Sequence, residues 1–364
     1  MNQDNTAGGD AASTLSITKA ATHFSAPAGY LSACTMGLPT RETLAALRAD
    51  LDSWERAETS AASYGDLVQE SRELYAKIVG TTASNVATGS QTSTLVGTVA
   101  SNVPDGAKIL CVDGDFSSVA HPFVQQAHRG VTVRYAPADQ LAEHITPDTH
   151  MVTFSLVQSA TGSIARSADI VAAAQRNNAL TLCDLTQATG WLPVNADDFD
   201  LTVCHTYKWL CIPRGVAFMT VSPELQQRYH APNAGWYSSE NVWGACYAPT
   251  MPLASDARRF DVSPAWQAWV GAREALSFFA SLDMDEVRDH NVALGNELCR
   301  GLGITEANQA IVAWPDADGS RLAALKDAGI TASGRAGRVR VAFHLWNTSD
   351  DVNAVLAAVL DAVD

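Results

Sequence analysis

The stretch from Leu180 to Phe218, LTLCDLTQATGWLPVNADDFDLTVCHTYKWLCIPRGVAF, decides the predicted fold. Its first apolar run ends at Asp184, and a second apolar run ends just before His205 and Lys208. Buried runs with polar ends are typical of neighbouring parallel strands, and α/β proteins bind their ligands at the carboxyl ends of such strands. The pattern therefore predicts an α/β fold with a ligand site between Asp184 and Lys208.

This pair of residues suits the cofactor pyridoxal 5′-phosphate (PLP). Asp184 would keep the pyridine nitrogen protonated, and Lys208 would form a Schiff base with the cofactor and later transfer protons. A strand-end acid or a surface lysine is common alone. Their joint order with Gln187, Tyr207 and a following Pro-Arg-Gly favours the catalytic interpretation.

The motif D-x-x-Q-x-x-G-x-x-P from Asp184, followed by T-Y-K-W-L-x-x-P-R-G from Thr206, resembles the class V branch of fold-type I PLP enzymes. That branch includes cysteine desulfurases, kynureninases, isopenicillin-epimerase-like proteins and several aminotransferases. The resemblance begins at about Tyr30 and continues to the C-terminus. It implies a large domain with a mostly parallel seven-stranded sheet flanked by helices, a small C-terminal α+β domain, and a homodimer with shared active sites.

The composition agrees with a two-domain globular protein of 364 residues, of which 47% are hydrophobic. We expect a disordered tail at residues 1–22, which lack the features of a signal peptide, a large PLP-binding domain at 23–262 and a small domain at 263–364. The net charge of −15 argues against a nucleic-acid or anionic-membrane partner. No apolar run reaches membrane-spanning length. Seven cysteines without a CxxC pair or metal-like clustering indicate a reduced, cytoplasmic protein.

A phosphate site is predicted where the sequence NVATGS, residues 85–90, leads into a helical run. A glycine turn before a helix N-terminus directs unpaired N–H groups at one point, so Ser90 and Gln91 are expected to bind the phosphate through their backbone. The resemblance adds His205, which could otherwise cap the strand end, and the hydroxyl of Tyr207. It also implies that the loop around Trp236, similar to a kynureninase Gly-Trp segment, reaches the active site of the partner subunit.

Contacts to the cofactor ring follow from the same resemblance. Phe116 follows a predicted strand in the sequence DGDFSS and would stack on the ring, as in kynureninases, although a core phenylalanine is the alternative. Gln187 would donate a hydrogen bond to the phenolic oxygen. Ser159 or Gln158 would lie near the same oxygen, where the family usually carries an asparagine.

The substrate carboxylate site is predicted near the C-terminus, where GRAGRVRVAFHLWNTSDDV resembles the family segment R-x-S/A-x-x-x-Y-N-T. The matching residue is Arg340, whose planar guanidinium would hold the α-carboxylate. Arg338 lies on the same strand face and is the rival. Desulfurases carry a nucleophilic cysteine on the preceding loop, but here that loop reads TASGRAGR, so desulfurase activity is disfavoured.

We therefore predict a PLP-dependent enzyme that acts on an α-amino acid, with aminotransfer as the leading reaction and no metal. A kynureninase-like or C–S β-lyase is the alternative, suggested by Phe116, Tyr207 and Trp236. The alternative of another class is a non-catalytic binding protein with this fold, which need not retain Lys208.

Overall fold

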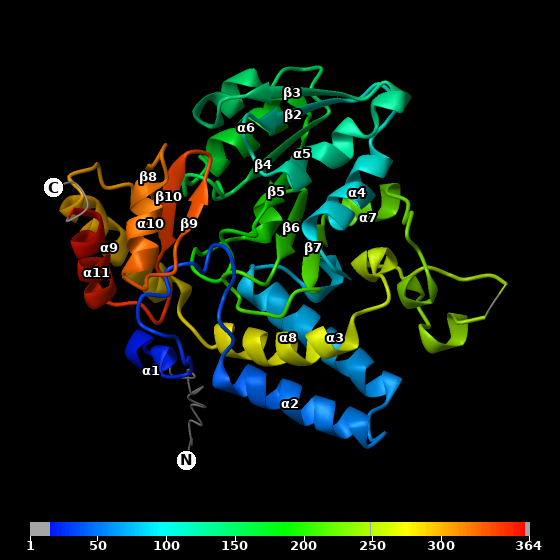
Figure 1. Ribbon diagram of the computed structural model, residues 1–364. Coiled ribbons are helices and arrows are strands. Elements are labelled where there is room, and N and C mark those ends of the chain that lie inside the picture. Colours follow the sequence, from blue (N-terminus) through cyan, green and yellow to red (C-terminus); the bar gives the residue numbers. More distant parts are fainter. Residues whose placement is uncertain (1–14, 248, 361–364) are drawn as a thin grey trace, which may run out of the picture.

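A computed structural model describes residues 15–247 and 249–360. Within these ranges seven strands form a sheet in the order β1-β7-β6-β5-β4-β2-β3 (Figure 1). The strands are β1 (Val86–Gly89), β2 (Lys108–Val112), β3 (Thr132–Ala136), β4 (Met151–Ser155), β5 (Leu180–Asp184), β6 (Leu201–His205) and β7 (Ala217–Val221). Only β7 runs antiparallel to its neighbours within this sheet. The predicted mostly parallel sheet is confirmed.

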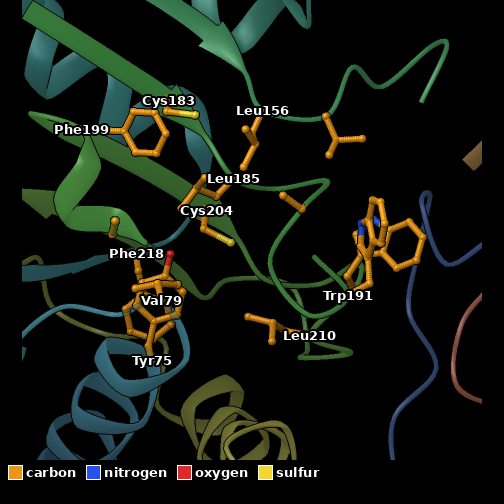
Figure 2. Packing of buried hydrophobic residues seen from close by; sticks show 14 of the residues in the cluster. Tyr75, Val79, Leu156, Cys183, Leu185, Trp191, Phe199, Cys204, Leu210 and Phe218 are labelled. Atoms are coloured by element: carbon orange, nitrogen blue, oxygen red, sulfur yellow. The ribbon is translucent and has the colours of Figure 1, made fainter. Parts of the chain in front are cut away.

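Helices cover both faces of this sheet, and every residue of β4, β6 and β7 is buried accordingly. One face packs against α4 (Thr92–Asn102), α5 (Ser117–Val124) and α7 (Pro223–Arg228). The other packs against α3 (Ala61–Ile78) and α6 (Ser167–Asn177). Figure 2 shows this second cluster, in which the rings of Tyr75 and Phe218 stack 4.1 Å apart between their centroids. Outside α3 lie α2 (Arg41–Glu55) and α8 (Trp266–Phe279).

The C-terminal part of the chain forms a smaller α+β unit beside the large sheet, as predicted (Figure 1). Its antiparallel sheet has the order β8-β10-β9 and consists of β8 (Ile311–Pro315), β9 (Ser333–Arg335) and β10 (Arg338–Ala342). Three helices accompany it: α9 (Met284–Gly301), α10 (Ser320–Asp327) and α11 (Ser349–Leu360). Their apolar side chains share one core cluster with β8 and β10.

Residues 30–37, which we call the strap, connect the small sheet to the segment that carries Lys208. Ser32 forms a bridge with Ala342 at the end of β10. At the other end of the strap, the N–H of Gly37 donates to the carbonyl of Tyr207 at 2.9 Å. A Cβ at position 37 would overlap the carbonyl oxygen of Lys208, so this close approach requires glycine.

The predicted tail of residues 1–22 is partly helical, because α1 (Ile17–Ala21) lies within it and buries Ala20. Residues 1–14 lie outside the described residues. None of the helices within the described ranges combines the length and apolar character needed to cross a membrane.

Candidate active site

The site lies at the carboxyl ends of the parallel strands, as predicted. Asp184 and His205 are the last residues of the neighbouring strands β5 and β6, and Lys208 follows three residues after β6. The exposed fractions of Asp184 and Lys208 are only 3% and 6%. An acid and a lysine that are far apart in sequence are therefore buried in one site, and each shifts the titration of the other.

Burial brings the pKa values of these two groups towards neutrality. It raises the pKa of Asp184 to about 6, against the opposing effects of the Thr186 N–H, which donates to Oδ1 at 2.8 Å, and of the Lys208 charge. Burial likewise lowers the pKa of Lys208 to about 8, and Asp184 opposes that shift. Lys208 can therefore supply an uncharged, nucleophilic amine near neutral pH.

The segment after Lys208 is held from two sides. The indole Nε1 of Trp209 donates to Oε1 of Gln187 at 2.8 Å, and the Trp209 carbonyl accepts from Nε2 of His344 at 2.9 Å. Gly190, with φ of +108°, approaches Trp209 so closely that a Cβ would lie 2.7 Å from its carbonyl. These contacts fix the backbone next to the lysine.

Gln187 links this segment to the strap and to the small sheet. Its amide nitrogen donates to the Cys34 carbonyl at 3.0 Å and to Ser159 Oγ at 3.1 Å. Ser159 Oγ in turn accepts from Nη1 of Arg340 at 3.3 Å, and the Ser159 carbonyl accepts from the same nitrogen. The structure thus places Gln187, Ser159 and Arg340 in one network.

Arg340 lies on β10 with an exposed fraction of 1%, whereas Arg338 on the same strand is exposed. Its other nitrogens donate to Thr35 Oγ1 at 3.0 Å and to Ser333 Oγ at 3.1 Å. No acid within the described ranges forms an ion pair with it. A buried guanidinium that has only neutral acceptors is suited to bind a carboxylate.

The other side of the site fits a phosphate. His205 is buried, and its Nε2 has no hydrogen-bond partner among the described residues. Burial, followed by the charges of Arg214 and Lys208, lowers its pKa to about 4. The guanidinium of Arg214 lies 4.3 Å from the ring centroid of Tyr207, which packs edge-on against His205. A buried polar atom without a partner is costly, so an anion that accepts from His205 fits this part of the site.

The remaining predicted residues lie in different surroundings. The ring centroid of Phe116 is 5.6 Å from Nζ of Lys208, and this side chain is 44% exposed, so it is not a core phenylalanine. Ser90 and Gln91 are exposed in the turn between β1 and α4. Trp236 packs against Trp243, with ring centroids 5.2 Å apart.

Some site residues have no signal in the sequence. Thr35 and Cys34 belong to the strap. Trp209 donates to Gln187, and Thr186 donates through its N–H to Asp184 and accepts the N–H of His205 through its hydroxyl. Asp115 supports the strand ends, because its carboxylate accepts from the N–H and hydroxyl of Ser155 at 2.8 and 2.7 Å. Among these residues, the sequence could have suggested only Thr186 and Trp209, because they are the chain neighbours of the predicted residues Gln187 and Lys208.

A cavity of about 610 Å³ lies beside the site, at the carboxyl ends of β2 and β4. Most of its wall is apolar, with Val112, Leu141 and Ile170 among the lining residues. Two further lining residues, Asp115 and Gln158, are the chain neighbours of Phe116 and Ser159. The small sheet contributes Ala336.

Comparisons with known proteins identify the family of this chain. The model of the family "Aminotransferase class-V" matches residues 54–321. The chain is 26% identical over 303 residues to an uncharacterized aminotransferase, YcbU, of Bacillus subtilis, covering 77% of this chain and 80% of that protein. It is 27% identical over 259 residues to a kynureninase of Deinococcus radiodurans, covering 68% of this chain and 62% of that one.

Solved structures share the fold at low identity. A complex of the cystine C–S lyase C-DES with cysteine persulfide superimposes with a TM-score of 0.83 at 21% identity, covering 92% of this chain and 98% of that one. The cysteine desulfurase CsdA of Escherichia coli gives 0.81 at 17% identity, covering 96% and 99%. With more than half of its length matched by the family model, the chain belongs to the class-V aminotransferase family of PLP-dependent enzymes.

Proposed function

We propose that this enzyme transfers the amino group of an α-amino acid. The observation that carries the proposal is the joint burial of Lys208, Asp184 and Arg340 around one site. Aminotransfer needs an amine that exchanges protons, a ring that withdraws electrons and an anchor for the carboxylate. The three residues meet these needs without a further catalytic group.

Each residue has a distinct task in this mechanism. PLP, when bound, supplies an aromatic ring that stabilises negative charge at the substrate Cα. Asp184 holds a proton at the ring nitrogen, and Lys208 Nζ moves a proton to and from Cα. Arg340 orients the substrate through its carboxylate. His205 and the neighbouring Tyr207 would bind on the phosphate side.

A lyase of kynureninase or C–S β-lyase type is the second candidate. Phe116 beside Lys208 and the similarity to a kynureninase support it. A desulfurase is disfavoured by the loop before β10, which lacks a cysteine. Cys34, the cysteine within the strap, is buried with 1% of its surface exposed, which disfavours the transfer of sulfur to an external acceptor. A non-catalytic binding role would not require a lysine at position 208, which is buried beside Asp184.

Product analysis separates these candidates. The PLP-loaded enzyme should be incubated with single amino acids, with and without a 2-keto acid as amino acceptor. Aminotransfer predicts a keto acid and a new amino acid in equal amounts when the acceptor is present, and at most about one enzyme equivalent of keto acid without it. Release of ammonia, or of a cleaved side-chain fragment without acceptor, would assign the enzyme to the lyases.

Arg340→Lys should weaken the binding of every amino-acid substrate by about 1–3 kcal/mol, the range for a charge-assisted hydrogen bond, and should also lower kcat through misorientation. Lysine retains the charge but loses the planar fork. The exposed Arg338→Lys is the matched control and should change little. Kinetics with the best substrate and with its decarboxylated amine test the assignment. Unchanged amino-acid kinetics in Arg340→Lys, or a wild-type preference for the amine, would contradict it.

We also propose that the enzyme is a homodimer in which the loop around Trp236 faces the partner subunit. In support, Trp243 is half-exposed and Tyr247 is fully exposed on this loop, which projects from the body of the subunit (Figure 1). Exposed aromatic side chains are common in interfaces between subunits. Light scattering at several protein concentrations measures the mass of the assembly.

A further inference from the structure

We propose that Arg335 binds an acidic group on the substrate side chain, so that the preferred substrates are amino acids with a second, anionic group. This inference rests on the proposed function, because it assumes that Arg340 holds the α-carboxylate. It assigns a role to a residue of the β9–β10 hairpin that no motif of the sequence indicates.

The hairpin fixes where Arg335 lies. The turn consists of Ala336 and Gly337, with φ of +47° and +70°, and positive φ at both positions is typical of a two-residue type I′ hairpin. This tight turn sets the register, in which Arg335 pairs with Arg338 and Ser333 pairs with Arg340. Paired residues of an antiparallel ladder, and residues two apart on a strand, share one face.

Arg335 therefore lies on the same face of the small sheet as the proposed carboxylate anchor. The contact between Ser333 Oγ and Nε of Arg340, at 3.1 Å, identifies this face as the one turned towards the site. Burial lowers the pKa values of both Lys208 and Arg340, and the charge of Arg335 lowers them further. Arg338 causes no comparable shift in either group.

The charge of Arg335 is not neutralised by the part of the chain that the structure describes. Its guanidinium donates to the carbonyl of Gly334 at 2.7 Å, and none of the ion pairs between described residues includes it. Arg166, at the wall of the neighbouring cavity, differs because it pairs with Asp169 at 3.8 Å and donates to the carbonyl of Asp139. Arg335 is thus available to an anion from solution.

The cavity beside the site offers room for the carbon atoms of such a side chain. Ala336, the neighbour of Arg335, lines it, and the lining also includes the chain neighbours of Phe116 and Ser159. Its buried polar groups are already satisfied, since Asp115 accepts from Ser155 and the Gln158 amide donates to Gly114. The apolar part of the wall suits methylene groups, whereas the lining carboxylates of Asp113, Asp115 and Asp139 disfavour an anion there, so the charged end is expected at Arg335, next to the lining residue Ala336.

The charges around the site also favour substrates with a second anionic group. Arg335 and Arg340 place two positive charges on one face of the small sheet, and no acid within the described ranges forms an ion pair with either of them, in a protein whose net charge is −15. Such a local excess attracts dianions more strongly than monoanions. A second guanidinium also distinguishes substrates by where the second acid lies, because the fork binds carboxylates in a fixed orientation.

Unreactive carboxylates provide a test that does not depend on turnover. Isothermal titration of the PLP-loaded enzyme would give the dissociation constants of succinate and glutarate, with butyrate as the monocarboxylate probe. The wild type should bind the better dicarboxylate at least about 10-fold more tightly than butyrate, as expected for one added charge-assisted contact. Arg335→Gln should abolish this preference and leave butyrate unchanged. Arg338→Gln is the matched control on the same face and should keep the preference.

Three results would overturn the inference. The first is a wild type without a dicarboxylate preference, or a preference that survives in Arg335→Gln. The second is an equal loss in Arg338→Gln, which would indicate a diffuse field instead of a contact. The third is weaker butyrate binding in Arg335→Gln, which would make Arg335 a second anchor for the α-carboxylate. Failure of the proposed function is distinguishable, because Arg340→Lys would then leave butyrate binding unchanged.

Discussion

Lys208→Ala should lose turnover by about 10⁴-fold or more, the upper range for removal of a positioned general acid–base group, because the same residue also attaches the cofactor. The lysine is buried, and its lowered pKa of about 8 makes its amine reactive near neutral pH. Among the described residues, the other lysines lie on α1, α3, α10 and at the start of β2, away from the site. The measurement is kcat/KM for the substrate found by product analysis, on protein saturated with PLP.

Two controls test whether the loss of turnover results from the missing amine of Lys208. Lys326→Ala removes an exposed lysine of α10 and should retain full activity. A small primary amine added to Lys208→Ala should restore part of the rate, since it replaces the missing proton carrier. Activity of Lys208→Ala within tenfold of wild type would contradict the assignment.

Asp184→Asn should lower kcat by about 10²–10³-fold, comparable to the removal of one preorganised electrostatic contact in other enzymes, or roughly 3 kcal/mol or more. Asparagine keeps the shape and still accepts the N–H of Thr186 through its Oδ1. It loses the charge that holds a proton on the ring nitrogen. A variant with near-normal kcat would show that Asp184 is not the partner of the ring.

The stability of the PLP-free protein provides an independent readout for Asp184. Its pKa is raised by burial from 3.8 to about 6, so the folded state binds this proton more tightly than the unfolded state. The contribution of Asp184 to stability is therefore present below pH 3.8 and is lost as the pH rises through 6. Asp184→Asn should lack this component. Melting temperatures of the two PLP-free proteins between pH 4 and 7 measure it, and identical pH profiles would contradict the raised pKa.

The fold was predictable because the central strands β4, β5 and β6 read as short buried runs with a polar end, whereas the edge strand β3 is mostly exposed. Asp184 and His205 mark two such ends, and parallel strands bring these ends to one edge of the sheet. The choice of Arg340 over Arg338 rested on the motif, and the structure buries the first and exposes the second. The strand ends followed from local patterns, whereas the choice of Arg340 came from the family resemblance, and its role in binding the carboxylate stays a prediction.

The contacts around the anchors were not predictable, because they join segments that are far apart in sequence. Thr35 and Arg340, whose side chains form a hydrogen bond, are 305 positions apart in the sequence. The strap that contains Thr35 has no periodic pattern. The position of Arg335 depends on the register of a hairpin whose turn, Ala336-Gly337, lacks the usual asparagine. Ser90 and Gln91 are exposed, and their role in phosphate binding stays a prediction.

The most direct test of the central assignment is to locate the lysine that carries PLP. The PLP-loaded enzyme should be reduced with borohydride, digested with a protease and analysed by mass spectrometry for the pyridoxyl group. We expect the label on the peptide that contains Lys208, and no label there in Lys208→Ala. Recovery of the label on another lysine, or failure to bind PLP after reconstitution, would contradict the account.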